Sequence, residues 1–236
     1  MNFASSFTPE KWAEALKVLQ DEFPFAIYET LYSTLLSTLF AVIIGLPLGV
    51  ILVTGEQKGI RPLPRWLMSF LNVLINLLRS VPFIILMVMI IPLTRVIVGT
   101  SVGTMASVVP LTVAAFPFIA RLVESSLREL NPNIIETSQS MGASPMQIVM
   151  HVMLPESVPS LITNLTLALT TIMGYTAMSG AVGGGGLGKL ALAYGYQRYR
   201  YLILYFAVIV LVVITQIIQS FGTWLARKCD KRLRDR

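Results

Sequence analysis

Five long apolar runs are the feature that most limits what this 236-residue chain can fold into. They lie near residues 31–54, 66–93, 103–122, 158–180 and 201–224. A helix needs about 20 residues to cross a hydrocarbon layer of ~30 Å, so each run is long enough to span a membrane. Hydrophobic residues make up 55% of the chain and charged residues only 13%, well below the charge of an ordinary soluble domain. We therefore expect an all-α polytopic membrane protein with five transmembrane helices.

The basic residues of the connecting segments predict the orientation of the chain. Eleven lysines and arginines fall on the side that holds the C-terminal tail, and six fall on the other side. Basic residues favour the cytoplasmic side, and an odd number of spans puts the two termini on opposite sides. The N-terminus is therefore expected outside and the C-terminus in the cytoplasm. The net charge of +6 then reflects topology, so membrane lipid is expected as a partner and nucleic acid is not.

The sequence divides into three parts. Residues 1–27 are expected to form an extracytoplasmic segment, residues 28–226 the transmembrane domain, and residues 227–236 a basic cytoplasmic tail. In the first part Thr8 and Pro9 can start a helix with an apolar stripe, which predicts an interfacial helix on the outer surface. A small partner-docking helix is the alternative. The stripe consists of Trp12, Leu16, Leu19 and Phe23.

A polar segment, residues 128–156, separates the third and fourth apolar runs. Asn131 can cap a short helix opened by Pro132, and Gly142 can end it. Ser144 and Pro145 can cap and open a second short helix, which we expect to stop at Leu154–Pro155. Two short helices joined at a glycine are predicted, and the alternative is an amphipathic loop on the membrane surface.

The spacing of Glu136, Gly142 and Leu154–Pro155 resembles the EAA loop of importer-type ABC permeases. Thr137, Ser138 and Val152 are small or conservative departures from that pattern. The resemblance implies a cytoplasmic coupling loop that inserts into a groove of an ATPase subunit. The ATPase-coupling residues are then expected to be Glu136, Gly142, Ala143, Ser144, Pro145, Leu154 and Pro155.

The glycine-rich segment 183–190 nearly matches a phosphate-binding P-loop. That motif needs Ser or Thr after its lysine to hold magnesium, and Leu190 has no hydroxyl. The segment is also expected on the outer side, away from ATP. A re-entrant or tightly packed connection before the last span is the better interpretation.

Four further stretches, residues 79–86, 174–178, 180–186 and 194–199, resemble the permease of methionine-uptake ABC transporters. That family implies a second copy of the permease, two ATPase subunits and an extracytoplasmic methionine-binding lipoprotein in the bacterial inner membrane. It also implies import of D- and L-methionine, with ATP and magnesium bound by the ATPase and no cofactor in this chain. Import of another small amino acid or related solute is the alternative.

One face of the fourth run is a candidate for the translocation pathway. Asn164, Thr171, Tyr175 and Met178 fall on it at helical spacing, and Met178 is expected to act as a gate by the same resemblance. Small and hydroxylated residues also let helices pack closely, which is the alternative. Arg79 is the main charge within a run and joins the candidates, although a structural ion pair or a snorkelling side chain would also explain it.

Two other functional classes fit the sequence poorly. An ion-coupled secondary transporter would show carboxylates inside its spans, whereas every Asp and Glu here lies in a loop, in the tail or near the end of a span. An enzyme would need a nucleophile–base pair or a metal cluster, and His151 is the single histidine. A membrane permease without its own catalytic or metal site is therefore the function expected. Five helices are too few to surround an aqueous path comfortably, so we expect a homodimer.

Overall fold

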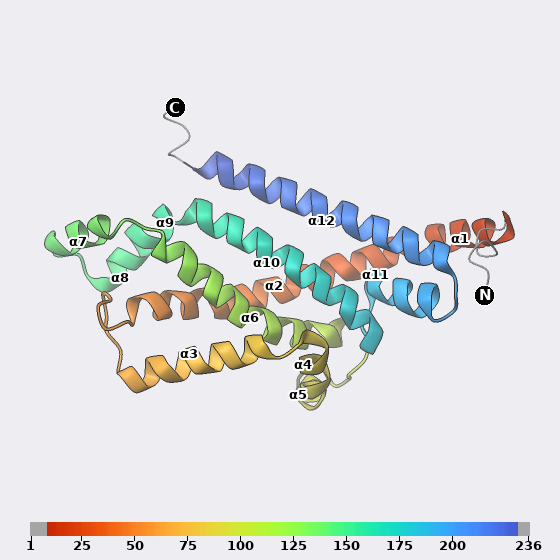
Figure 1. Ribbon diagram of the computed structural model, residues 1–236, viewed down its shortest axis with the longest axis horizontal. Coiled ribbons are helices and arrows are strands. Elements are labelled where there is room, and N and C mark those ends of the chain that lie inside the picture. The colour runs from red at the N-terminus through yellow and green to blue at the C-terminus, as the bar shows by residue number, and fades with distance from the viewer. Residues whose placement is uncertain (1–8, 231–236) are drawn as a thin grey trace. The chain divides into compact units, whose positions relative to one another are not determined.

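The computed structural model describes residues 9–230, and helices account for most of them, with no strand in that range (Figure 1). The longer helices are α1 (Pro9–Asp21), α2 (Phe23–Thr54), α3 (Arg65–Ser80), α6 (Thr104–Arg128), α10 (Val158–Ser179) and α12 (Tyr201–Cys229). The shorter ones are α4 (Phe83–Met89), α5 (Ile91–Val98), α7 (Pro132–Ser140), α8 (Pro145–Gln147), α9 (Leu154–Glu156) and α11 (Gly186–Lys189). Two π-helices, η2 (Ile148–Met153) and η4 (Leu190–Tyr196), and a 3₁₀ turn, η3 (Gly180–Val182), complete the order. The predicted all-α class is confirmed.

Four of the described helical segments are long and apolar enough to cross a membrane: α2, α6, α10 together with η3, and α12. A fifth candidate exists only if α3 and α4 count as one span. The expectation of one helix over 66–93 is wrong, because the helix ends at Ser80 and a new one starts at Phe83. Val81 is extended, with φ −79° and ψ 125°, which is the conformation that a following proline imposes on its neighbour. Pro82 therefore divides this run rather than only bending it.

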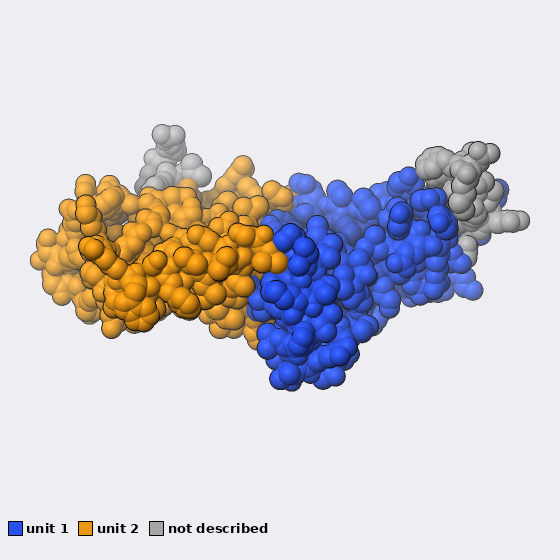
Figure 2. Space-filling model, turned by 60° about the horizontal axis from the view of Figure 1, so that its bottom comes forward, with its two compact units in different colours: residues 1–39, 82–113, 169–218 blue, residues 40–81, 114–168, 219–236 orange. Residues whose placement is uncertain are grey.

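The contacts of the chain define two compact units, coloured separately in Figure 2. Unit 1 comprises residues 1–39, 82–113 and 169–218, and unit 2 comprises residues 40–81, 114–168 and 219–236. Because the long helices pass through the division, α2, α6, α10 and α12 each contribute residues to both units.

Unit 1 has an apolar core that includes the N-terminal helix. Ala15 of α1 is 2% exposed and packs in one cluster with Phe23, Leu187 and Ile203. The Trp12 ring meets the Phe206 ring of α12 edge-on, with 6.0 Å between centroids. An amphipathic helix was expected here and is present, but part of its apolar surface contacts protein. Thr8, its predicted cap, lies outside the described residues.

The glycine-rich segment of unit 1 is bound internally. Gly186 has φ +78°, and its N–H donates to a carboxylate oxygen of Glu29 at 2.8 Å. The next N–H, of Leu187, donates to the Thr30 hydroxyl at 2.9 Å, and Thr104 also hydrogen-bonds to Glu29. Two N–H donors of this segment, those of Gly186 and Leu187, are thus used within the protein. A Cβ on Gly180 would overlap the backbone of residues 188–189, which fits a tightly packed connection.

In unit 2, α2 crosses α6 at two glycines one helical turn apart. A Cβ on Gly45 would lie 2.8 Å from the Phe116 carbonyl oxygen, and one on Gly49 would lie 2.7 Å from that of Ala120. Helices in membranes associate through this kind of close approach because lipid provides little hydrophobic drive. Next to the crossing, Leu52, Met68, Ile75 and Ala120 form a buried cluster.

We predict that Gly49→Ala lowers the stability of the fold. The added methyl would meet backbone that cannot swing away, and such overpacking costs about 1–3 kcal/mol. Gly174→Ala is the matched control, since Gly174 is also helical but, apart from the backbone of its own helix, no atom of the described residues lies within 4 Å of the position that the added methyl would take. There the change should be neutral or stabilising by about 0.5–1 kcal/mol. Thermal unfolding in detergent measures both, and equal midpoints for the two variants would contradict the close crossing.

Candidate functional site

The polar segment between α6 and α10 begins with the short helix α7. The side-chain oxygen of Asn131 accepts the N–H of Asn133 at 3.0 Å, and Pro132 occupies the first turn, as predicted from the sequence. The hydroxyls of Thr137, Ser138 and Ser140 bond back to the carbonyls four residues earlier at 2.7–2.9 Å. Glu136 lies on the same helix, and its side chain is exposed. The helix therefore presents a polar surface whose hydroxyls are already satisfied.

Gly142 reverses the chain after α7. Its φ is +81°, in the left-handed region that side chains disfavour, and its N–H donates to the Gln139 carbonyl at 2.9 Å. Among the described residues, nothing beyond its two chain neighbours lies within 4 Å of the position that a Cβ would take there. The predicted role in ending the helix is confirmed, and its cause is the backbone conformation rather than crowding inside the chain.

Ser144 starts the second helical stretch with a capping box. Its N–H donates to the Gln147 side chain at 2.8 Å, and its hydroxyl accepts the Gln147 N–H at 3.4 Å. The stretch then continues through α8, η2 and α9 to Glu156. The expectation that Leu154–Pro155 stops this helix is therefore wrong. Pro155 lies in the first turn of α9, where its missing N–H costs little, and the preceding π-helix changes the register of bonding.

Three methionines give this polar loop an apolar surface. Met141, Met146 and Met150 are 83%, 67% and 54% exposed, while Ile148 and Met153 are buried at 0% and 1%. The two buried side chains hold the stretch on unit 2, and the three exposed ones remain available. Flexible, polarisable methionine is typical of adaptable binding surfaces. Sequence reasoning passed over these residues, although apolar side chains in an otherwise polar loop were the available signal.

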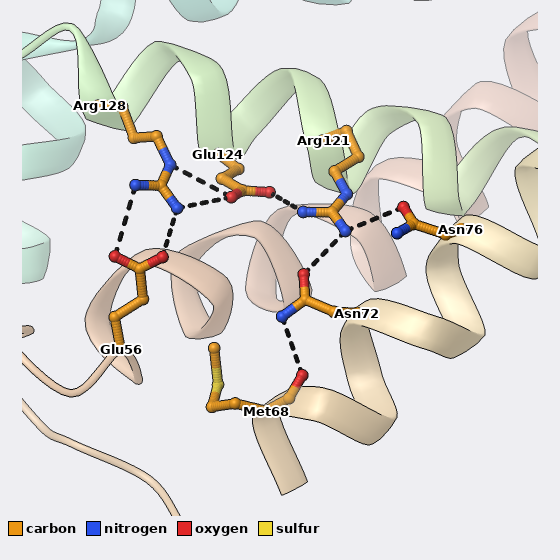
Figure 3. A network of polar contacts seen from close by, with 7 residues as sticks. All are labelled: Glu56, Met68, Asn72, Asn76, Arg121, Glu124 and Arg128. Carbon is orange, nitrogen blue, oxygen red and sulfur yellow. Dashed lines mark hydrogen bonds and ion pairs between the residues drawn. The ribbon is translucent and has the colours of Figure 1, made fainter. Parts of the chain in front are cut away.

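The start of the loop is held by a network of charges in unit 2 (Figure 3). Arg128, the last residue of α6, pairs with Glu56 at 2.5 Å and with Glu124 at 2.8 Å. Glu124 also pairs with Arg121 at 2.6 Å. Arg121 in turn donates to the side-chain oxygens of two asparagines of α3, Asn72 at 2.8 Å and Asn76 at 3.0 Å. The Arg128 guanidinium is thus directed to Glu56 and Glu124.

Burial differs sharply along this network. Glu124 is only 8% exposed, whereas the side chains of Arg128 and Glu56 are 47% and 46% exposed. An exposed ion pair contributes about 0–1 kcal/mol to folding, so the Glu56–Arg128 pair adds little stability. Removing a partner from a buried, hydrogen-bonded charge costs more. The sequence analysis missed Glu124, although the spacing of Arg121, Glu124 and Arg128 on one helix face was a visible signal.

The predicted pathway residues lie in different surroundings. In unit 1 the Tyr175 ring stacks on Phe83 with 4.7 Å between centroids, and Met178 is 46% exposed. Thr171, also in unit 1, is half-buried, and Arg79 is exposed at the end of α3 in unit 2. Asn164 of unit 2 donates to the Leu122 carbonyl at 3.2 Å and to Ser126 at 2.8 Å. These bonds favour a packing role for Asn164, and the pathway assignment of the whole set stays a prediction.

Within residues 9–230 no group of three or more His, Cys, Asp and Glu side chains is arranged to hold a metal ion. His151 is exposed in η2, with Nδ1 3.3 Å from the Gln147 carbonyl oxygen. The arrangement is that of a loop presented by a helical scaffold, with three exposed methionines and an ion-pair network at its start.

Comparison with known families explains this arrangement. Residues 45–235 match the family described as binding-protein-dependent transport system inner membrane component. The chain belongs to this family. The permease is thus a multi-pass protein of the inner membrane, and its loop between α6 and α10 is part of the family region.

Individual relatives agree over most of their length. The permease is 47% identical to the probable D-methionine transport system permease protein MetI of Vibrio cholerae over 208 residues, 88% of this chain and 92% of that protein. It is 40% identical to the methionine import system permease protein MetP of Bacillus subtilis over 164 residues, 70% and 74% of the two chains.

Solved structures show the same fold. A chain of the MetNI methionine ABC transporter in an inward-facing conformation superposes with a TM-score of 0.86 at 44% identity, covering 89% of this chain and 96% of that one. A chain of an amino acid ABC transporter crystallised with histidines superposes with a TM-score of 0.72 at 17% identity, covering 97% and 99%. The second likeness supports the fold alone.

Proposed function

We propose that the permease is the transmembrane subunit of an ABC importer that carries methionine into the cytoplasm. The observation that carries the proposal is 47% identity to a probable D-methionine permease over 92% of that relative's length. ATP hydrolysis belongs to a separate subunit, so this chain supplies the path and the mechanical link. Another small amino acid or a related solute is the competing cargo.

The assembly proposed has two copies of the permease, two ATPase subunits that bind ATP and magnesium, and an extracytoplasmic methionine-binding lipoprotein. The N-terminus lies outside and the C-terminus in the cytoplasm, as the distribution of basic residues favours. The segment 128–156 then lies on the ATPase side. In this assembly a movement of the loop accompanies nucleotide binding, and the permease changes between two arrangements of its helices.

The loop supports a docking role through three features. Gly142 sets a sharp reversal, the Ser144 capping box fixes the start of the second helix, and Met141, Met146 and Met150 offer exposed apolar surface. A rigid scaffold with a few adaptable apolar contacts suits a groove in a partner protein. Glu136, Ala143, Leu154 and Pro155 complete the set of proposed coupling residues.

The candidate gate in unit 1 consists of Met178 and the stacked rings of Tyr175 and Phe83. Met178 is exposed within an apolar helix, and Tyr175 is held flat against Phe83 with only 6° between the rings. A flexible thioether beside a fixed aromatic pair suits the passage of a thioether amino acid. The geometry gives less support to the other pathway candidates, which are Arg79, Asn164 and Thr171.

The cargo can be tested by growth. Methionine auxotrophs that lack other methionine uptake should grow on low methionine when they carry this permease with its ATPase and binding protein. Uptake of radiolabelled methionine is the direct measurement, with histidine and lysine as competing cargoes. Uptake of either of those without methionine uptake would contradict the assignment.

The docking role can be tested at Gly142. We predict that Gly142→Asp yields a permease that inserts normally but binds its ATPase poorly. An unpaired charge buried at an interface costs about 2–5 kcal/mol, enough to reduce binding by tenfold or more. Co-purification of the ATPase and methionine uptake are the measurements.

Gly99→Asp is the matched control for backbone strain. Gly99 also has φ +81°, also ends a short helix, and also has no atom within 4 Å of a Cβ position. If strain alone mattered, both variants would behave alike. We expect ATPase binding to fail only for Gly142→Asp, and normal methionine transport by that variant would refute the docking role.

A further inference from the structure

We infer that Arg128 is a positioning residue that makes the coupling loop and α3 move together, through Glu56 on one side and Glu124 and Arg121 on the other. This inference rests on the proposed function and adds a route by which loop movement reaches the membrane helices. It assigns a role to charged residues that lie outside the loop pattern itself.

The route is set by the position of Arg128 at the junction of helix and loop. It is the last residue of α6, three residues before the Asn131 cap of α7. One guanidinium nitrogen, Nη2, donates both to Glu56 at 2.5 Å and to Glu124 at 2.8 Å. Any displacement of this junction therefore acts directly on the connection between α2 and α3, where Glu56 lies.

A second branch reaches the body of α3. Glu124 receives Arg128 on one carboxylate oxygen and Arg121 on the other, so it joins the two guanidinium groups. Arg121 continues to Asn72 and Asn76, one turn apart on α3 (Figure 3). Asn72 is itself held, since its amide donates to the Met68 carbonyl at 2.9 Å. The loop junction thus has two polar connections, one to the α2–α3 connection just after α2 ends and one to the side of α3.

The uneven burial of the network indicates that it transmits movement of the loop and contributes little to the stability of the fold. Unit 2 already holds α2 to α6 by glycine contacts and α3 to both by the cluster of Leu52, Met68, Ile75 and Ala120. Against that background the exposed Glu56–Arg128 pair adds little to folding. The pair instead fixes the geometry of the junction, because a forked guanidinium sets the distance and angle between the carboxylates that it binds.

The test compares neighbouring alanine variants in the full transporter reconstituted in vesicles. Glu56→Ala removes the link to Arg128, whereas Gln57→Ala removes a 2.9 Å contact to Arg65, the first residue of α3, that does not involve Arg128. The readout is methionine imported per ATP hydrolysed, with ATPase co-purification and the unfolding midpoint measured on the same preparations. We expect Glu56→Ala to lower the import ratio by about fivefold, the lower range of typical coupling effects, and Gln57→Ala to leave it unchanged.

A covalent tether gives the converse test. Glu56→Cys and Arg128→Cys are combined with Cys229→Ser, which removes the only native cysteine of the chain, and joined by a reducible bis-methanethiosulfonate linker. We expect the import ratio to be low before linking, to recover while the linker is present, and to fall again on reduction. Variants with one engineered cysteine should not respond to the reagent.

Three results would overturn the inference alone. The first is that Glu56→Ala keeps the wild-type ratio of methionine imported per ATP hydrolysed, while the wild-type transporter imports methionine normally. The second is that the ratio falls in Glu56→Ala only in parallel with reduced ATPase co-purification, which would make the Glu56–Arg128 pair an assembly contact. A linked double-cysteine transporter that stays uncoupled would also overturn it. A wild-type complex that hydrolyses ATP but imports no methionine would instead refute the proposed function on which the inference rests.

Discussion

The structure depends on one constraint: a backbone N–H or C=O inside hydrocarbon has no water to bond and must find its partner within the protein. Continuous helix meets that requirement locally, which is why α2, α6, α10 and α12 are long and uninterrupted. Two buried hydroxyls of α2 follow the same rule, since Thr30 and Thr38 each bond to the carbonyl four residues earlier, whereas the buried hydroxyls of Thr34 and Thr112 have no hydrogen-bond partner among the described residues. Non-helical backbone occurs where protein supplies partners, as Glu29 and Thr30 do for the glycine-rich turn.

At the end of α6 the constraint changes, and the chemistry changes with it. Here the helix can carry Arg121, Glu124 and Arg128 because each charge has a partner within reach. The following loop exposes polar helix surface and three methionines, which a span within lipid could not combine with open backbone turns. The site is therefore the part of the chain whose backbone does not need to find all its hydrogen-bond partners within the protein. Ion pairs hold its start, and the burial of Ile148 and Met153 holds its second half.

Much of the fold follows from apolar run length: the starts of α6, α10 and α12 and the ends of α2 and α10 were predicted within one residue. A single helix was expected over 66–93, but run length cannot show that Val81, before Pro82, becomes extended and divides it. At Pro155 the error is the opposite, because a helix stop was predicted where the helical stretch continues. A proline in the first turn of a helix does not break it, and only the preceding π-helix shows that α9 starts at this point. The amphipathic stripe of α1 was visible, yet periodicity cannot distinguish a lipid surface from the protein surface that Ala15 contacts.

The site was predictable where a residue type acts locally. Asn131, Gly142 and Ser144 have caps and turns that need only their immediate neighbours, and all three adopt them. Glu124 and its partners join segments about 50–70 residues apart, so their meeting depends on helix packing that no local rule supplies. The same limit applies to Tyr175, whose partner Phe83 comes from a distant helix.

The central claim is that the loop presents its methionines to an ATPase subunit. A photo-cross-linking amino acid at Met146 of the assembled transporter tests it most directly, with Val96, an 84% exposed residue of α5, as the comparison position. The account predicts an adduct with the ATPase subunit from position 146 and none from position 96. An ATPase adduct from position 96, or adducts from position 146 with lipid alone, would contradict it.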